Sequence, residues 1–201
     1  MWFLYSKFKA KKWKKYTPEK RFVILRELEK KVAKKLDIEP LYLEIKEGGE
    51  DWNCFGSFTV YNNTKKIILN PMLIYEPKYR FHAMETIAHE TRHAYQFSVA
   101  NRKLKWYEFR AKKWQRNWSG YFSSGIDNLM YNNQSIERDA QKFSIKFLKK
   151  HSGKYSNDLD FQNTLDAVEY RYNQADLDAR KKYGFFYKHK IEQNIKNNSK
   201  Y

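Results

Sequence analysis

Two histidines in this sequence are spaced so that a single metal ion could bind both. They belong to the run His89-Glu90-Thr91-Arg92-His93. Residues four apart in a helix lie one above the other, so both imidazoles could reach one ion at about 2.0–2.1 Å. Glu90 would lie one step around the helix, where its carboxylate could take a proton from a metal-bound water. Because zinc lowers the pKa of bound water to about 7, the run predicts a hydrolytic zinc site with Glu90 as the general base.

The same pair has a plainer interpretation, as two surface histidines one turn apart on an ordinary helix. The neighbouring residues favour the metal site, because Met84, Ile87, Ala88 and Ala94 would form an apolar face that packs inward. The sequence contains no competing Gly-x-Ser-x-Gly elbow, phosphate-binding Gly-rich loop or Cys-x-x-Cys pair. We therefore expect these histidines to bind a metal.

A catalytic zinc usually takes three protein ligands, so a third donor must come from elsewhere in the chain. The remaining histidines, His82, His151 and His189, do not stand in the Gly-containing extension that supplies a third histidine in metzincins. Glu137 is the better candidate, because it falls in the first turn of a helix predicted after a long loop. Acids in that position are also favoured by the helix dipole, so simple capping is the alternative role.

The chain resembles the ImmA/IrrE-type and related mobile-element zinc metallopeptidases. The resemblance rests on residues 89–93 and on the later run Glu137-Arg138-Asp139-Ala140-Gln141-Lys142-Phe143-Ser144. In that family the first Glu of the second run is the third zinc ligand, which implies the same role for Glu137 in a gluzincin-like set. The resemblance also implies a zincin-like fold, Zn²⁺ as cofactor and hydrolysis of a protein or peptide substrate. Three residues depart from the usual family pattern: Asp139, Gln141 and Ser144.

Four further side chains could support such a centre. Glu85 precedes His89 by one turn and could orient its imidazole, although exposure to solvent is the commoner situation for Glu. Asp139 could accept a hydrogen bond from a ligand imidazole, although its position in the helix turns it away from the ligand two residues earlier. Tyr121 and Tyr131 could donate to the oxyanion of a tetrahedral intermediate.

The predicted elements make an α+β domain, with a small antiparallel sheet packed on the active-site helix and further helices after it. Short β-branched runs predict strands at 41–45, 55–61 and 66–69. Apolar spacing and caps predict helices at 18–36, 80–100, 104–118, 135–150 and 158–183, with a loop over 119–134. The second strand could pair with an extended peptide at a sheet edge, or could lie centrally.

Length and composition favour one compact domain. We expect a basic aromatic arm over 1–17, a zincin-like domain over 18–187 and a polar, flexible tail over 188–201. The single cysteine, Cys54, cannot form an internal disulfide and is expected to be a small buried apolar residue. No apolar run predicts a membrane span or the core of a signal peptide, so we expect a cytoplasmic protein.

The net charge of +17 is concentrated in two segments. Residues 1–36 carry thirteen Lys or Arg against three Glu, and residues 101–118 carry seven against one, interleaved with aromatic rings. This pattern is typical of surfaces that hold phosphates and stack on the bases of nucleic acid. Solvated faces of a Lys-rich composition are the simpler interpretation. The second hypothesis is therefore a nucleic-acid-binding or regulatory protein on a zincin scaffold.

Overall fold

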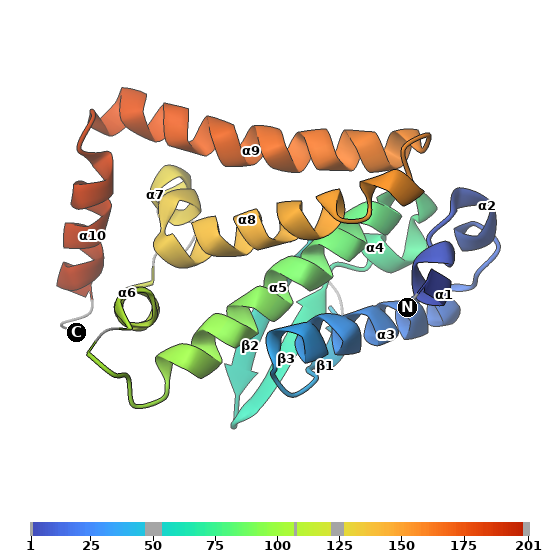
Figure 1. The fold of residues 1–201 in the computed structure, drawn as a ribbon, viewed down its shortest axis with the longest axis horizontal. Coiled ribbons are helices and arrows are strands. Elements are labelled where there is room, and N and C mark those ends of the chain that lie inside the picture. The colour runs from blue at the N-terminus through green and yellow to red at the C-terminus, as the bar shows by residue number, and fades with distance from the viewer. Residues whose placement is uncertain (1, 47–53, 107, 122–126, 199–201) are drawn as a thin grey trace.

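The computed structural model describes residues 2–46, 54–106, 108–121 and 127–198. Within these residues the structure is α+β, with ten α-helices and one three-stranded sheet (Figure 1). The strands are β1 (Tyr42–Ile45), β2 (Gly56–Tyr61) and β3 (Thr64–Leu69). The helices are α1 (Trp2–Ser6), α2 (Ala10–Trp13), α3 (Pro18–Leu36), α4 (Met72–Tyr75), α5 (Arg80–Ala100), α6 (Phe109–Ser119), α7 (Asn128–Asn133), α8 (Ser135–Lys149), α9 (Leu159–Tyr183) and α10 (Tyr187–Asn198). None of them has both the length and the apolar character needed to cross a membrane.

The sheet is mixed, and the expectation of an antiparallel sheet was wrong. β2 and β3 form an antiparallel hairpin through Asn62 and Asn63, whose φ angles of 47° and 62° lie in the left-handed region that Asn tolerates. β1 pairs with the other side of β3 and runs parallel to it. Alternating apolar residues predict a strand but not the direction of its partner, which explains the error. The strand order β1-β3-β2 leaves β2 at an edge.

Helix α5 is the central element of the structure (Figure 1). Its bounds are those predicted from the sequence, and it contacts α3, the sheet, α6, α8 and α9. At its start, the buried Arg80 pairs with Asp158 at 2.6 Å and with Asp160. Its opposite faces therefore lie against the sheet and against the C-terminal helices, and the start of α5 is tied to the start of α9.

The first residues pack into the core instead of extending from the domain as an arm. Leu4, Tyr5, Phe8 and Trp13 are buried and belong to the main hydrophobic cluster. The guanidinium of Arg21, in α3, donates to the carbonyl of Trp13 at 3.2 Å. Burial of these large side chains stabilises the segment against the core, and its lysines remain on the outside.

The C-terminal residues expected to form a flexible tail are helical as far as Asn198. Helix α9 ends at Tyr183 and is followed by Gly184, whose φ of 80° suits glycine; α10 then packs against α6, α7 and α9. Ile191 and Ile195 of α10 are buried against Met130. Two apolar residues in a polar stretch were too weak a signal for the helix, because its stability depends on this tertiary contact. Residues 199–201 lie outside the described residues.

Smaller corrections apply elsewhere. Cys54 is exposed, not buried. The loop expected over 119–134 contains α7, capped by the Asp127 carboxylate, while residues 122–126 lie outside the described residues. Helix α6 begins at Phe109 instead of 104, and the N-cap of α8 is Gln134 instead of Ser135.

Candidate metal centre

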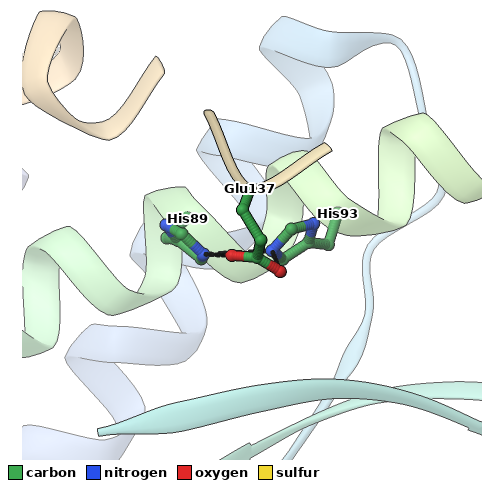
Figure 2. Close-up of side chains that lie close together, drawn as sticks. All are labelled: His89, His93 and Glu137. Carbon is green, nitrogen blue, oxygen red and sulfur yellow. Dashed lines mark hydrogen bonds and ion pairs between the residues drawn. The ribbon is translucent and has the colours of Figure 1, made fainter. Parts of the chain in front are cut away.

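The imidazoles of His89 and His93 and the carboxylate of Glu137 meet between α5 and α8 (Figure 2). Helical spacing puts both imidazoles on one face of α5, and α8 brings Glu137 opposite them in its first turn. The two Nε2 atoms lie 3.0 Å apart. The carboxylate oxygens of Glu137 lie 3.4 Å from Nε2 of His89 and 3.3 Å from Nε2 of His93.

These separations fit one small tetrahedral ion. Ligand atoms about 2.05 Å from such an ion lie about 3.3 Å from one another. The two Nε2 atoms are 3.0 Å apart and each lies 3.3 to 3.4 Å from one of the two Glu137 oxygens, so the three residues are spaced closely enough to share one ion. Two imidazoles and one carboxylate are a donor set that zinc accepts in catalytic sites, and other divalent ions bind it too.

Gln96 fixes which nitrogen of His93 can bind a metal. Its side-chain amide donates to the carbonyl of Ile136 at 2.9 Å and to the carboxylate of Asp139 at 2.9 Å. Its oxygen must therefore face Nδ1 of His93, which lies 2.9 Å away. With the proton on Nδ1, the lone pair of Nε2 points toward Glu137 and His89.

The charges of the three residues support one another. Burial alone would lower the pKa of both imidazoles, but the hydrogen bonds and charge of Glu137 raise the pKa of His89 to about 9 and also raise that of His93. Burial alone would raise the pKa of Glu137, but the two imidazoles hold the pKa of this carboxyl well below its usual range. Glu137 therefore remains ionised, which is the form that binds a metal.

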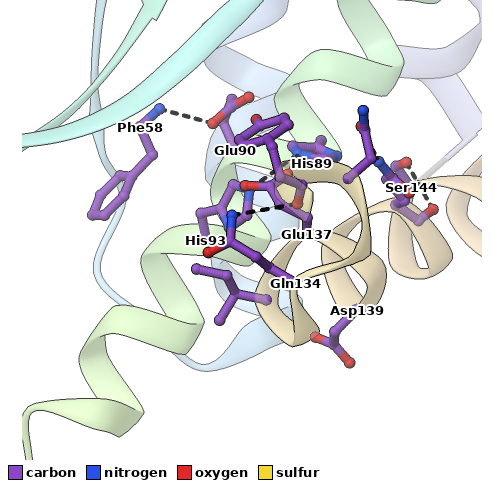
Figure 3. A network of polar contacts seen from close by, with 12 residues as sticks. Phe58, His89, Glu90, His93, Gln134, Glu137, Asp139 and Ser144 are labelled. Atoms are coloured by element: carbon purple, nitrogen blue, oxygen red, sulfur yellow. Dashed lines mark hydrogen bonds and ion pairs between the residues drawn. The ribbon is translucent and has the colours of Figure 1, made fainter. Parts of the chain in front are cut away.

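Glu90 lies beside the cluster without belonging to it (Figure 3). The backbone N–H of Phe58, in β2, donates to its Oε2 at 2.7 Å. Burial raises the pKa of Glu90, and the nearby imidazoles only partly offset this effect. The close approach of β2 to α5 requires Gly56, since a Cβ there would lie 2.5 Å from Cγ2 of Thr86. The edge strand thus holds Glu90 next to the metal-ligand face.

A cavity of about 340 Å³ opens beside these donors. Its walls come from α5, β2, α7, α8 and α9, and His89, Glu90 and Glu137 all line it. Among the described lining residues, Arg171 of α9 is the only Lys or Arg. The volume is within the range of small-ligand sites, so a side chain and adjoining backbone of a peptide could enter.

The other predicted site residues lie close to the cluster, with different contacts from those expected. Glu85 is buried and accepts from the Ser144 hydroxyl at 2.8 Å, while its carboxylate is 3.9 Å from Nδ1 of His89. Asp139 does not touch an imidazole: it pairs with Arg92 at 2.7 Å and reaches His93 only through an intervening amide. It therefore supports the site indirectly.

The two predicted tyrosines differ in their positions. The hydroxyl of Tyr121 donates to Oε1 of Glu137 at 2.8 Å, and its ring stacks on Trp118. Tyr131 lines the cavity, and burial together with the Glu137 charge raises the pKa of its hydroxyl. Tyr121 thus helps to orient Glu137, and Tyr131 lies beside the same carboxylate at the wall of the cavity, where a ligand could contact it.

Sequence reasoning missed Gln96, Ser144 and the Phe58 N–H as partners of the site. Gln96 gave a usable signal, because it is a polar residue three positions after a candidate ligand, within a helix whose face was predicted to be buried. The Phe58 contact gave no such signal, since its donor is a backbone N–H, which does not depend on the type of residue.

The comparisons with known proteins do not identify a family for this chain. No protein-family model matches the sequence, and no curated protein or solved structure matches it. The function is therefore inferred from the site itself.

Proposed function

We propose that this protein is a zinc-dependent peptidase with a zincin-like fold, acting in the cytoplasm on a protein or peptide substrate. The observation that supports this most strongly is the cluster of two imidazoles 3.0 Å apart, each 3.3 to 3.4 Å from an oxygen of the Glu137 carboxylate, with Glu90 in the cavity that His89 and Glu137 line. His89, His93 and Glu137 would hold the ion. Zinc in that position would lower the pKa of a bound water and polarise a substrate carbonyl.

Glu90 is the general base in this proposal. Its carboxylate is fixed by the Phe58 N–H and lines the cavity, so it can take a proton from the attacking water and pass it to the leaving amine. Tyr131 supplies a hydroxyl donor for the developing oxyanion.

The edge strand gives a route for substrate binding. In β2 the backbone groups of Ser57, Thr59 and Tyr61 face β3, and those of the residues between them face away from it. Phe58 is one of these outward-facing residues, since its N–H reaches Glu90. Within the described residues this edge of β2 is not paired with a further strand and runs past Glu90, so an extended peptide paired along it, beside the Phe58 N–H that Glu90 already accepts from, would pass the reacting groups.

The first test is metal content, measured by mass spectrometry on protein purified from metal-replete cells. Wild type should carry near-stoichiometric zinc, and His93→Ala and Glu137→Ala should lose it. A wild-type protein without metal would overturn the proposal.

The second test separates binding from catalysis. Glu90→Gln should keep its zinc and lose hydrolysis of a mixed peptide library, since the amide cannot act as a base. Full hydrolysis by a zinc-loaded Glu90→Gln variant would rule out the mechanism.

A further inference from the structure

Helix α6 carries four cations, Arg110, Lys112, Lys113 and Arg116, and no acidic residue. Of these, Lys113 pairs with Glu192 of α10. The other three have no ion pair among the residues that the structure describes. Surface cations are usually offset by interspersed acids, so this helix has an unbalanced positive charge.

A cavity of about 350 Å³ lies where α6 faces α8 and α10. Each of the three helices contributes one stripe of residues at three- and four-residue steps, which is one helix face. The stripes are 110, 113, 114 and 117 in α6, 135, 138, 139 and 142 in α8, and 188, 191, 192 and 195 in α10. Three converging helix faces therefore form most of the cavity, with Asn133 of α7 and Tyr172 of α9 completing it, at the end of the molecule where α6 and α10 lie together (Figure 1).

The charge of this cavity is positive. Its lining contains five cations, Arg110, Lys113, Arg138, Lys142 and Lys188, and two acids, Asp139 and Glu192. Both acids are already paired, Asp139 with Arg92 and Glu192 with Lys113. Within the described part of the chain, Arg110 and Lys142 have no acidic partner, so the lining has positive charge left for an anion.

One cation of the lining is held in a fixed orientation. The guanidinium of Arg138 lies 3.5 Å from the centre of the Tyr172 ring and donates to the Tyr172 carbonyl. A planar guanidinium anchored in this way loses little further freedom when it binds a phosphate.

The positive surface continues around α6. A second hollow on the helix is lined by Phe109, Lys112, Lys113, Gln115 and Arg116, and Lys113 lines the cavity as well. Phe109 is 71% exposed, and Trp106, just before the helix, is 76% exposed. The exposed ring of Phe109 thus lies beside cations of the second hollow, and the exposed Trp106 precedes the same helix in the chain.

We propose that this surface, made of α6 with the facing stripes of α8 and α10, binds single-stranded nucleic acid. Repeated cations match the repeated phosphates of a strand, and exposed rings can stack on unpaired bases. A duplex keeps its bases stacked inside, so it would use the cations without the rings. This binding site is separate from the proposed peptidase reaction and does not depend on it.

The test is fluorescence anisotropy with a labelled oligothymidylate, using the full chain. Binding should weaken steeply with salt, because each neutralised phosphate releases counterions. For a single strand, the logarithm of the association constant falls against the logarithm of the salt concentration with a slope of about −0.7 for each neutralised phosphate. The variant Arg110→Gln, Lys112→Gln, Arg116→Gln, Lys142→Gln should bind at least about tenfold more weakly and show a smaller salt slope.

A matched control removes the same charge elsewhere. Lys11→Gln, Lys12→Gln, Lys14→Gln, Lys15→Gln changes four exposed lysines near α2, in the other basic segment. This control should retain most of the affinity, and melting temperatures should show that both variants fold. Equal losses in the two variants would mean that only net charge matters and would overturn the proposal.

Two further arms test the choice of ligand. Trp106→Ala with Phe109→Ala should weaken oligothymidylate binding by about fivefold or more, because each stacked base contributes. A duplex of the same sequence should bind more weakly than the single strand. Equal affinity for the duplex, or equal competition by polyglutamate, would show a general polyanion surface and would contradict the assignment.

Discussion

The charged residues on the two sides of α8 differ in burial and in pairing. On the side facing α5, Glu137 is 1% exposed and contacts two imidazoles and the Tyr121 hydroxyl. On the side facing α6, Lys142 is exposed and has no acidic partner within the described residues. One helix therefore borders a buried, closely matched cluster and an open, unbalanced surface.

This difference in charge pairing determines how specific a function each region supports. Burying a carboxylate costs free energy unless cations and donors replace the lost water, so the position of Glu137 reflects a built site. An exposed lysine costs little without a partner, so the charge of the α6 surface permits binding without demanding it. The first region supports a specific chemistry, and the second supports a class of ligand.

The largest expected effect is the linkage between zinc and stability. Zinc at about one hundred times its dissociation constant should raise the free energy of unfolding of wild type by about 2.7 kcal/mol. His93→Ala and Glu137→Ala should lose this gain. The variant in which Arg110, Lys112, Arg116 and Lys142 are changed to Gln should keep it. Denaturant titrations with and without zinc measure the effect. A gain of equal size in the ligand variants would show that the stabilising zinc binds elsewhere.

Gln96→Leu should have the next largest effect. Removing the acceptor for Nδ1 of His93 frees its tautomer and orientation, and changes of this kind lower metal affinity by about 10 to 100-fold. Competition with a zinc-binding dye measures the affinity. Gln115→Leu, at an exposed position of α6, is the matched control and should bind zinc like wild type. An unchanged affinity in Gln96→Leu would mean that the ring is oriented by packing alone.

Local patterns were enough to predict that His89 and His93 share one face of a helix. The bounds of α5 and the pairing of His89 with His93 follow from helix periodicity, which depends only on neighbouring residues. Glu137 was more difficult, because its role depends on how α8 docks on α5. The resemblance to a peptidase family and the need for a third ligand suggested it, and the structure brings it within 3.4 Å of both imidazoles.

The features that were predicted wrongly depend on contacts between distant segments. The direction of β1 relative to β3 is set by pairing across the sheet, and the burial of Phe8 and Trp13 by docking on α3 and α5. The helix α10 depends on Met130, about sixty positions earlier, for the burial of Ile191 and Ile195. Periodicity within one segment carries no information on such partners.

Tyr121→Phe should have a smaller effect than Gln96→Leu. Its hydroxyl makes one hydrogen bond to Glu137, and removing one such bond to a charged group costs about 1.5–3 kcal/mol at most, part of which water replaces because Tyr121 is 39% exposed. Zinc affinity should fall by about tenfold or less. Tyr170→Phe, exposed on α9, is the control and should not change it. A complete loss of zinc in Tyr121→Phe would mean that this hydroxyl is essential to the site.

The smallest expected effect tests whether the two regions are independent. Neutralising Arg110, Lys112, Arg116 and Lys142 should leave zinc affinity within about twofold at 0.1 M salt, because exposed charges are screened over about 10 Å. A larger change would imply coupling through the hydrogen bonds that link the basic cavity to the metal site, from Asp139 through the Gln96 amide to His93. Coupling of this kind is reciprocal, so bound zinc would then have to alter oligothymidylate affinity by the same factor.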